Sequence, residues 1–128
     1  MPIQAVLPGY PIYQGSKKIS VVDLKGPVSY AGGGETIQAA QFGQGGIDAV
    51  EPLNKGIVTM PTAAADSVPE MVALSMSGTY FVTITFGTGT NGDAVTSVTI
   101  KWYVTATGVE AGAIDLSAEI VRALFIFV

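Results

Sequence analysis

Two neighbouring segments, residues 79–86 and 94–106, alternate between apolar and polar side chains, and this pattern restricts the fold more than any other feature of the sequence. A period of two places successive side chains on opposite faces of a strand, so each segment predicts a strand with one buried face. Trp102 falls on the apolar face, and Phe81 is the exception on the polar one. Asn91-Gly92 lies between the segments and suits the tight type I′ turn of a hairpin. We therefore expect an antiparallel hairpin here.

Further short segments between glycines and prolines predict the remaining strands, at residues 17–31, 47–51, 56–60, 71–77 and 118–128. In the first of these, Val28 falls on the apolar face, Ser20 marks the solvent-exposed end of that face, and Asp23 points to the other side. Residues 61–69, bounded by prolines, predict a surface loop. The last segment is apolar on both faces apart from Arg122, so it must be covered twice, either as the central strand of a sandwich or by a subunit interface.

The glycine-rich stretch Val28–Asp48 is predicted to be a corner that carries the chain from one sheet to another. The run Gly32–Gly34 permits positive φ and sharp reversals of the backbone. Residues 37–42 favour one short helical turn, with Thr36 as its N-cap and Gly43 as its C-cap glycine. Together with the strands, this predicts an all-β fold: a two-layer antiparallel sandwich of about seven or eight strands, jelly-roll-like or, as the alternative, immunoglobulin-like.

The chain is expected to divide into an extended N-terminal arm, residues 1–15, and a single β-sandwich domain, residues 16–128. Pro2, Pro8 and Pro11 exclude a helix or a central strand from the arm. A disordered tail is usually polar, whereas this arm is uncharged and rich in apolar side chains. We expect it to dock onto its own domain or onto an adjacent subunit rather than remain a free terminus.

Composition excludes several functions. The 128-residue chain has no Cys and no His, which removes disulfides, the usual zinc sites and the commonest general base. Only 12% of its residues are charged, with a net charge of −4, and six scattered basic residues do not form the basic stripe that nucleic-acid binding requires. Residues 71–92 are uncharged and long enough to cross a bilayer, but their alternation predicts strands, so no membrane partner is expected.

No group of residues predicts catalysis. The glycines before Glu35 lack the order of a phosphate-binding loop, and an acidic residue there would repel phosphate. The carboxylates lie on predicted turns or outward strand faces, without a His or Arg cluster to tune them and without calcium-loop spacing; they include Asp23, Glu35, Asp48, Glu51, Asp66, Asp93 and Glu110. We therefore expect no enzyme, no metal and no cofactor.

The order of residues from Gly26 to Asp48 resembles that of small virion proteins of tailed bacteriophages. The matching residues are Gly26, Val28, Tyr30, Gly33, Gly34, Glu35, Ala39, Ala40, Phe42, Gly43, Gly46, Ile47 and Asp48, and Asp115-Leu116-Ser117 before the last strand is a second similar piece. Proteins of this kind often serve as capsid decoration or cement proteins, and others belong to necks or fibres. The resemblance implies a protein made in the host cytoplasm that decorates the outer capsid surface of the virion and bridges adjacent capsomers. It implies the major capsid protein and further copies of this chain as partners, and a trimer because decoration sites often coincide with threefold positions.

Apolar and aromatic side chains of the arm and of the outward strand faces are the expected contacts with these partners. They are Ile3, Val6, Leu7, Tyr10, Ile12, Tyr13, Phe81, Tyr103, Leu124 and Ile126. The exposed aromatics expected among them could instead form a platform that stacks on sugars, so a carbohydrate-binding module is an alternative function, as is a neck or fibre component. Trp102 on the predicted core face argues against the sugar platform.

Overall fold

A computed structural model describes residues 3–53, 71–87 and 95–128, with the backbone alone at residues 3–5 and 71. The expected strand at 56–60, the expected loop at 61–69 and the Asn91-Gly92 turn lie outside the described residues.

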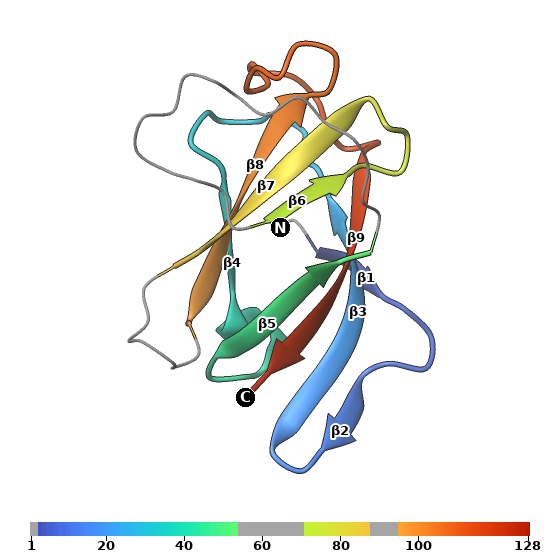
Figure 1. Cartoon of the computed structure of the whole chain (residues 1–128), viewed down its shortest axis with the longest axis vertical. Coiled ribbons are helices and arrows are strands. Elements are labelled where there is room, and N and C mark those ends of the chain that lie inside the picture. Colours follow the sequence, from blue (N-terminus) through green and yellow to red (C-terminus); the bar gives the residue numbers. More distant parts are fainter. Residues whose placement is uncertain (1–2, 54–70, 88–94) are drawn as a thin grey trace.

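The described residues form nine strands in two antiparallel sheets packed as a sandwich, so the predicted fold class is confirmed (Figure 1). The first sheet contains β1 (Ile3–Val6), β2 (Ile12–Gln14), β3 (Lys17–Lys25), β5 (Ile47–Pro52) and β9 (Ile120–Phe127), and the second contains β4 (Glu35–Gln38), β6 (Met71–Leu74), β7 (Tyr80–Phe86) and β8 (Ser97–Val104). The first sheet has the order β1-β3-β9-β5, with β2 also on β3, and the second has the order β4-β8-β7-β6. Because β1 and β2 share one edge of β3, both sheets are four strand positions wide.

The N-terminal segment pairs with its own chain. β1 pairs with the second half of β3, with Val6 opposite Val22, and β2 pairs with the first half, with Ile12 opposite Ile19. Directly after β1, the backbone N–H of Leu7 donates to the carbonyl of Val21 in β3 at 2.9 Å. Pro8 and Pro11 fall in the loop between β1 and β2, at the edge of the sheet, where a missing backbone donor costs no ladder hydrogen bond.

The predicted corner at residues 28–48 is confirmed, because the chain passes from β3 in the first sheet to β4 in the second and returns through β5. Its helical turn is a 3₁₀ turn, η1 (Ala39–Phe42), that ends at Gly43 with φ 73°, as expected of a C-cap glycine. The prediction that Thr36 caps this turn is wrong. Thr36 lies in β4, whose pairing with β8 overrides the local preference for helix, and Gln38 precedes the turn instead.

Aromatic side chains join the corner to the core. The ring of Phe42 lies 5.7 Å from that of Phe125 and 4.6 Å from that of Phe127, and the two rings of β9 lie 5.6 Å apart, all measured between centroids. Trp102 is 1% exposed, as its place on the apolar face of β8 predicts. β9 lies between β3 and β5, so its prediction as a central strand is confirmed, and its core-facing side chains are fully buried.

Several assignments based on alternation are wrong. Ser20 was expected at a solvent-exposed end, but it is fully buried opposite Phe125. Val28 was expected to face the core, but it is 72% exposed, because β3 ends at Lys25 and the alternation ends with it. In β7, Thr83 lies on the polar side of the alternation, which was expected to face water, but it is 2% exposed, so the outward face of the second sheet is covered at this position.

Candidate functional site

The outer face of the first sheet, the side away from the core, carries a continuous apolar surface. The registers align Ile12, Ile19, Ile126 and Ala49 in one row across β2, β3, β9 and β5. In the next row, Val21 of β3 lies opposite Leu124 of β9. Ile12 is 49% exposed, and the side chains of Ile19, Ala49, Leu124 and Ile126 are partly exposed, whereas Val21 is 5% exposed and forms the floor of this surface. We call these six residues the outer-face patch.

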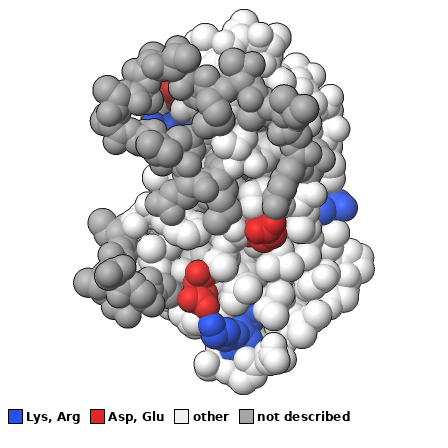
Figure 2. All heavy atoms as spheres, viewed as in Figure 1, with Lys and Arg blue, Asp and Glu red and all other residues white. Residues whose placement is uncertain are grey.

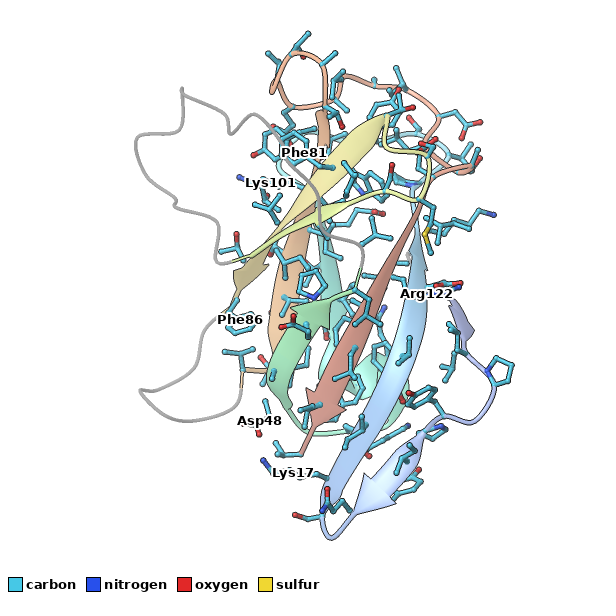
Figure 3. All side chains as sticks on the ribbon, turned by 45° about the vertical axis from the view of Figure 1, so that its right-hand side comes forward. Lys17, Asp48, Phe81, Phe86, Lys101 and Arg122 are labelled. Carbon is cyan, nitrogen blue, oxygen red and sulfur yellow. The ribbon has the colours of Figure 1, made fainter. Side chains whose placement is uncertain are left out.

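Ion pairs lie at both ends of the outer-face patch. At one end Arg122 donates to both carboxylate oxygens of Asp23, at 2.7 and 3.1 Å, a two-point contact that also raises the pKa of Arg122. At the other end Lys17 pairs with Asp48. Figure 3 shows Lys17 beside Asp48 near the end of β9 and Arg122 farther up that strand. The charges on this face therefore neutralise each other locally.

The predicted interface residues divide into three groups, of which Phe81 and Tyr103 form the last. Ile12, Leu124 and Ile126 come together on the outer-face patch. Val6 and Tyr13 are exposed on the edge strands, at 41% and 67%, while Leu7 and Tyr10 are partly exposed and the side chain of Ile3 is not described.

The prediction that Phe81 and Tyr103 are exposed is wrong. They are 0% and 8% exposed, and their rings stack on each other at 5.2 Å between centroids. Both lie on directly paired positions of β7 and β8, so each ring covers the other. They therefore offer almost no surface to a partner.

Three residues of the patch were missed by the sequence reasoning, namely Ile19, Val21 and Ala49. The first two share a face with Asp23 in the sequence of β3, and that face was interpreted as polar from its charged members alone. The apolar residues on that face would have predicted Ile19 and Val21 as part of the patch. Ala49 could not be found this way, because β5 changes register between Ile47 and Ala49.

Three further apolar side chains are exposed at the other end of β3, in the loops between β3 and β4 and between β8 and β9. We call this region the loop end; its exposed apolar residues are Val28, Val109 and Ile114, which are 72%, 62% and 38% exposed. Two backbone hydrogen bonds hold the loops together, from Tyr30 N–H to the Ile114 carbonyl at 3.0 Å and from Leu116 N–H to the Pro27 carbonyl at 2.8 Å. The loop end is therefore a fixed part of the sandwich.

Hydrogen bonds of Tyr30 connect both loops to β8. Its hydroxyl donates to Glu110 Oε2 at 2.6 Å and accepts from the backbone N–H of Trp102 at 3.3 Å. Gly33 N–H donates to the same Glu110 oxygen at 3.0 Å, with Gly33 at φ 96°, a conformation that favours glycine. Burial and then the hydrogen bond to Glu110 raise the pKa of Tyr30, so the hydroxyl stays protonated.

Glu35 is a carboxylate on the core side of the second sheet. It pairs in register with Ile100, whose side chain is buried in the core, and Trp102 lies two residues farther along the same face of β8. Glu35 Oε1 and Trp102 Nε1 are buried, and neither atom has a well-formed hydrogen bond, although the interaction of Trp102 with Glu35 favours the charged carboxylate and opposes part of the effect of burial on its pKa. Burial raises the pKa of Glu35, because the charged carboxylate is poorly solvated there.

Glu35→Gln is expected to raise the melting temperature at neutral pH and to leave it unchanged in acid. The folded-state pKa lies above the unfolded one, so the stability that Glu35 contributes is fully present below the unfolded pKa and is lost as the pH rises through the folded pKa. Glutamine resembles the protonated acid and does not undergo this loss. Thermal unfolding of both chains between about pH 4 and about pH 8 measures the difference, with Glu51→Gln at an exposed position as control. If the difference in melting temperature between Glu35→Gln and the wild type did not grow with pH, the raised pKa of Glu35 would be contradicted.

The described residues contain no group of three or more acidic side chains placed to hold a metal ion. Among them there is also no helix long and apolar enough to cross a membrane. The carboxylates considered for catalysis that are described do not form one cluster: Asp23 and Asp48 are in ion pairs, Glu51 lies in β5 opposite Leu124, Glu110 is bound to Tyr30 and Gly33, and Glu35 faces the core. Asp66 and Asp93 lie outside the described residues.

No protein-family model, curated protein or solved structure matches this chain.

Proposed function

We propose that this chain is a structural virion protein of a tailed phage that decorates the outer capsid surface and cements adjacent capsomers. The identity rests on the resemblance of the Gly26–Asp48 segment, and the mechanism rests on the geometry. A cement protein must contact two neighbours at once through a body that does not deform. The observation that carries the proposal is that apolar side chains are exposed in two separate regions of one sandwich, on the outer face of the first sheet and at the loop end.

Hydrogen bonds connect the two sheets of the sandwich that carries these surfaces. Met76 N–H, in the turn between β6 and β7, donates to the Ile120 carbonyl at 2.8 Å and so connects the second sheet to β9. In the same turn the hydroxyls of Ser75 and Ser77 donate to Glu119 Oε1 at 3.0 and 2.5 Å. With the contacts of Tyr30 to Glu110 and Trp102, these bonds link the two sheets at the loop end.

The surface chemistry also favours a protein partner. Figure 2 shows one side of the molecule with few charged side chains, separated by wide uncharged areas. With a net charge of −4, such a surface suits contact with protein through apolar and hydrogen-bonding groups rather than binding to a polyanion. The major capsid protein is the partner that we propose for the loop end.

A carbohydrate-binding module is the weaker candidate. Of the four aromatic side chains that could have formed a platform for sugar, Phe81 and Tyr103 are buried against each other. Tyr10 and Tyr13 remain on the N-terminal segment, and Tyr10 is only partly exposed. A neck or fibre component would use the same surfaces and differs in copy number alone.

Copy number in purified particles tests the proposal. Quantitative mass spectrometry of the phage that encodes the chain should find it at a fixed, simple ratio to the major capsid protein, as expected of a component that occupies equivalent lattice sites. A count far below that of the capsid protein would place the chain in the neck, tail or fibres. Its absence from the particles would overturn the virion assignment.

A further inference from the structure

We infer that the outer-face patch is a self-association surface, and that its occupant is the same patch of a second copy of this chain, related by a twofold axis. The inference does not depend on the virion assignment. It rests on the chemistry of the face, on the protection of the sheet edges and on the area available.

Charge is the first argument. The outer face carries Lys17, Lys25 and Arg122 with Asp23, Asp48 and Glu51, three groups of each sign, and so has a net charge of zero in a chain of net charge −4. A face of this composition can approach its own copy without like-charge repulsion. Because each end of the patch has one acidic and one basic partner, an ion pair meets an ion pair whichever way the two copies are oriented.

The apolar rows are the second argument. The row Ile12–Ile19–Ile126–Ala49 crosses four strands without a polar interruption, and the partly exposed Leu124 continues it toward the ion pair of Asp23 and Arg122. Two such faces pack about 10 Å apart in sandwiches, with their side chains interdigitating. Packing a second copy on this face would bury the half-exposed side chains of β9, which is apolar on both sides.

The described edges of both sheets do not favour association by strand addition. β1 and β2 have only four and three residues and are separated by a loop with Pro8 and Pro11, while β5 is irregular between Ile47 and Ala49. At the edges of the second sheet, β4 and β6 have four residues each. Short, interrupted edges resist pairing with another chain, so the outer face is the better surface for a second copy.

The area sets the expected strength. With strands about 4.8 Å apart and residues about 3.3 Å apart, the whole outer face, ion pairs included, covers roughly 400–500 Å² per copy, or about 800–1,000 Å² for the pair. This is below the size of a standard specific interface, so a weak, concentration-dependent dimer is expected, with a Kd of roughly micromolar or weaker. An isologous contact closes after two copies, so it yields a dimer and not the trimer that the resemblance implies.

Sedimentation equilibrium of the purified full chain, over about a thousandfold range of concentration centred on the micromolar, tests the inference. The wild-type chain should pass from monomer to dimer. Ile126→Lys, at the centre of the patch, and Ile12→Lys, at its rim, should each weaken dimerisation at least about tenfold, because each places an ammonium group in the apolar contact. Val109→Lys is the matched control at the loop end and should dimerise like the wild type.

Circular dichroism and thermal unfolding of each variant show whether it is folded. Ile12 is 49% exposed on an edge strand, so Ile12→Lys tests the face even if Ile126→Lys fails to fold. A wild-type chain that stays monomeric throughout the range, or that forms trimers, overturns the inference. A dimer that a folded Ile12→Lys chain retains at wild-type strength also overturns it.

Discussion

Replacing Phe42 by alanine is expected to lower the free energy of unfolding by about 3–5 kcal/mol, a large part of the stability of a single domain. Phe42 is 8% exposed and packs on both Phe125 and Phe127, so its loss leaves a cavity between the corner and β9. The 3₁₀ turn that presents it is fixed by the bonds from Ala39 N–H to the Thr96 carbonyl at 2.9 Å and from Lys18 Nζ to the Phe42 carbonyl at 2.8 Å, so it cannot readily move to fill the gap. Urea unfolding followed by circular dichroism measures the change.

Tyr13→Ala is the control, since it removes an aromatic ring that is 67% exposed. It should change the free energy of unfolding by no more than about 0.5 kcal/mol. If the two variants had equal stability, the role of Phe42 in joining the corner to the core would be refuted.

Gly26→Ala is expected to destabilise the fold by at least about 3 kcal/mol or to prevent folding. A Cβ at Gly26 would lie 2.2 Å from the carbonyl oxygen of Leu116 and 2.6 Å from its Cβ. Leu116 is fully buried and cannot retreat, because its N–H is bonded to the Pro27 carbonyl at 2.8 Å. The clash is with backbone, so no change of rotamer relieves it. Thermal unfolding and soluble yield measure the outcome.

Gly32→Ala is the matched control, in the same connection between β3 and β4. Gly32 does not have a positive φ, and nothing lies within 4 Å of a Cβ built there. Alanine at this position should be neutral or should stabilise the chain by up to about 1 kcal/mol, because it restricts the unfolded state. Equal melting temperatures for the two alanine variants would show that the approach of Leu116 to Gly26 is not a constraint.

The parts of the fold that depend on local pattern could be predicted from the sequence. The alternation of residues 79–86 and 94–106 identified β7 and β8, and the glycines of the 28–48 segment identified the corner between the sheets. In these places side-chain period and glycine geometry act over a few residues, so a reading of neighbouring positions is sufficient. β3 ends at Lys25, directly before Gly26-Pro27. This end is also marked by neighbouring residues, although the strand expected at residues 17–31 continued past it.

Features that depend on distant pairing could not be predicted. Ile12 and Ile126 join one row only because β2 and β9 both pair with β3, and no local pattern contains that register. Thr36 has the side chain of a helix cap, but pairing with β8 makes it part of a strand. Phe81 resembled an exposed aromatic because its burial depends on Tyr103, on the opposite strand. The candidate site was therefore identified in part, through the apolar face of β9, while its extent required the structure.

The position of β9 has a consequence for the order in which the protein can fold. Residues 120–127 are the last of the described strands to leave the ribosome, yet they lie at the centre of the first sheet, between β3 and β5. Until they emerge, β3 and β5 have no partner between them, and the rings of Phe125 and Phe127 are missing from the core. The second sheet, whose strands β6, β7 and β8 are consecutive hairpin neighbours, can form earlier from local contacts. The nascent chain thus spends most of its synthesis with one sheet open and its apolar strands exposed, which makes this period the one most prone to aggregation.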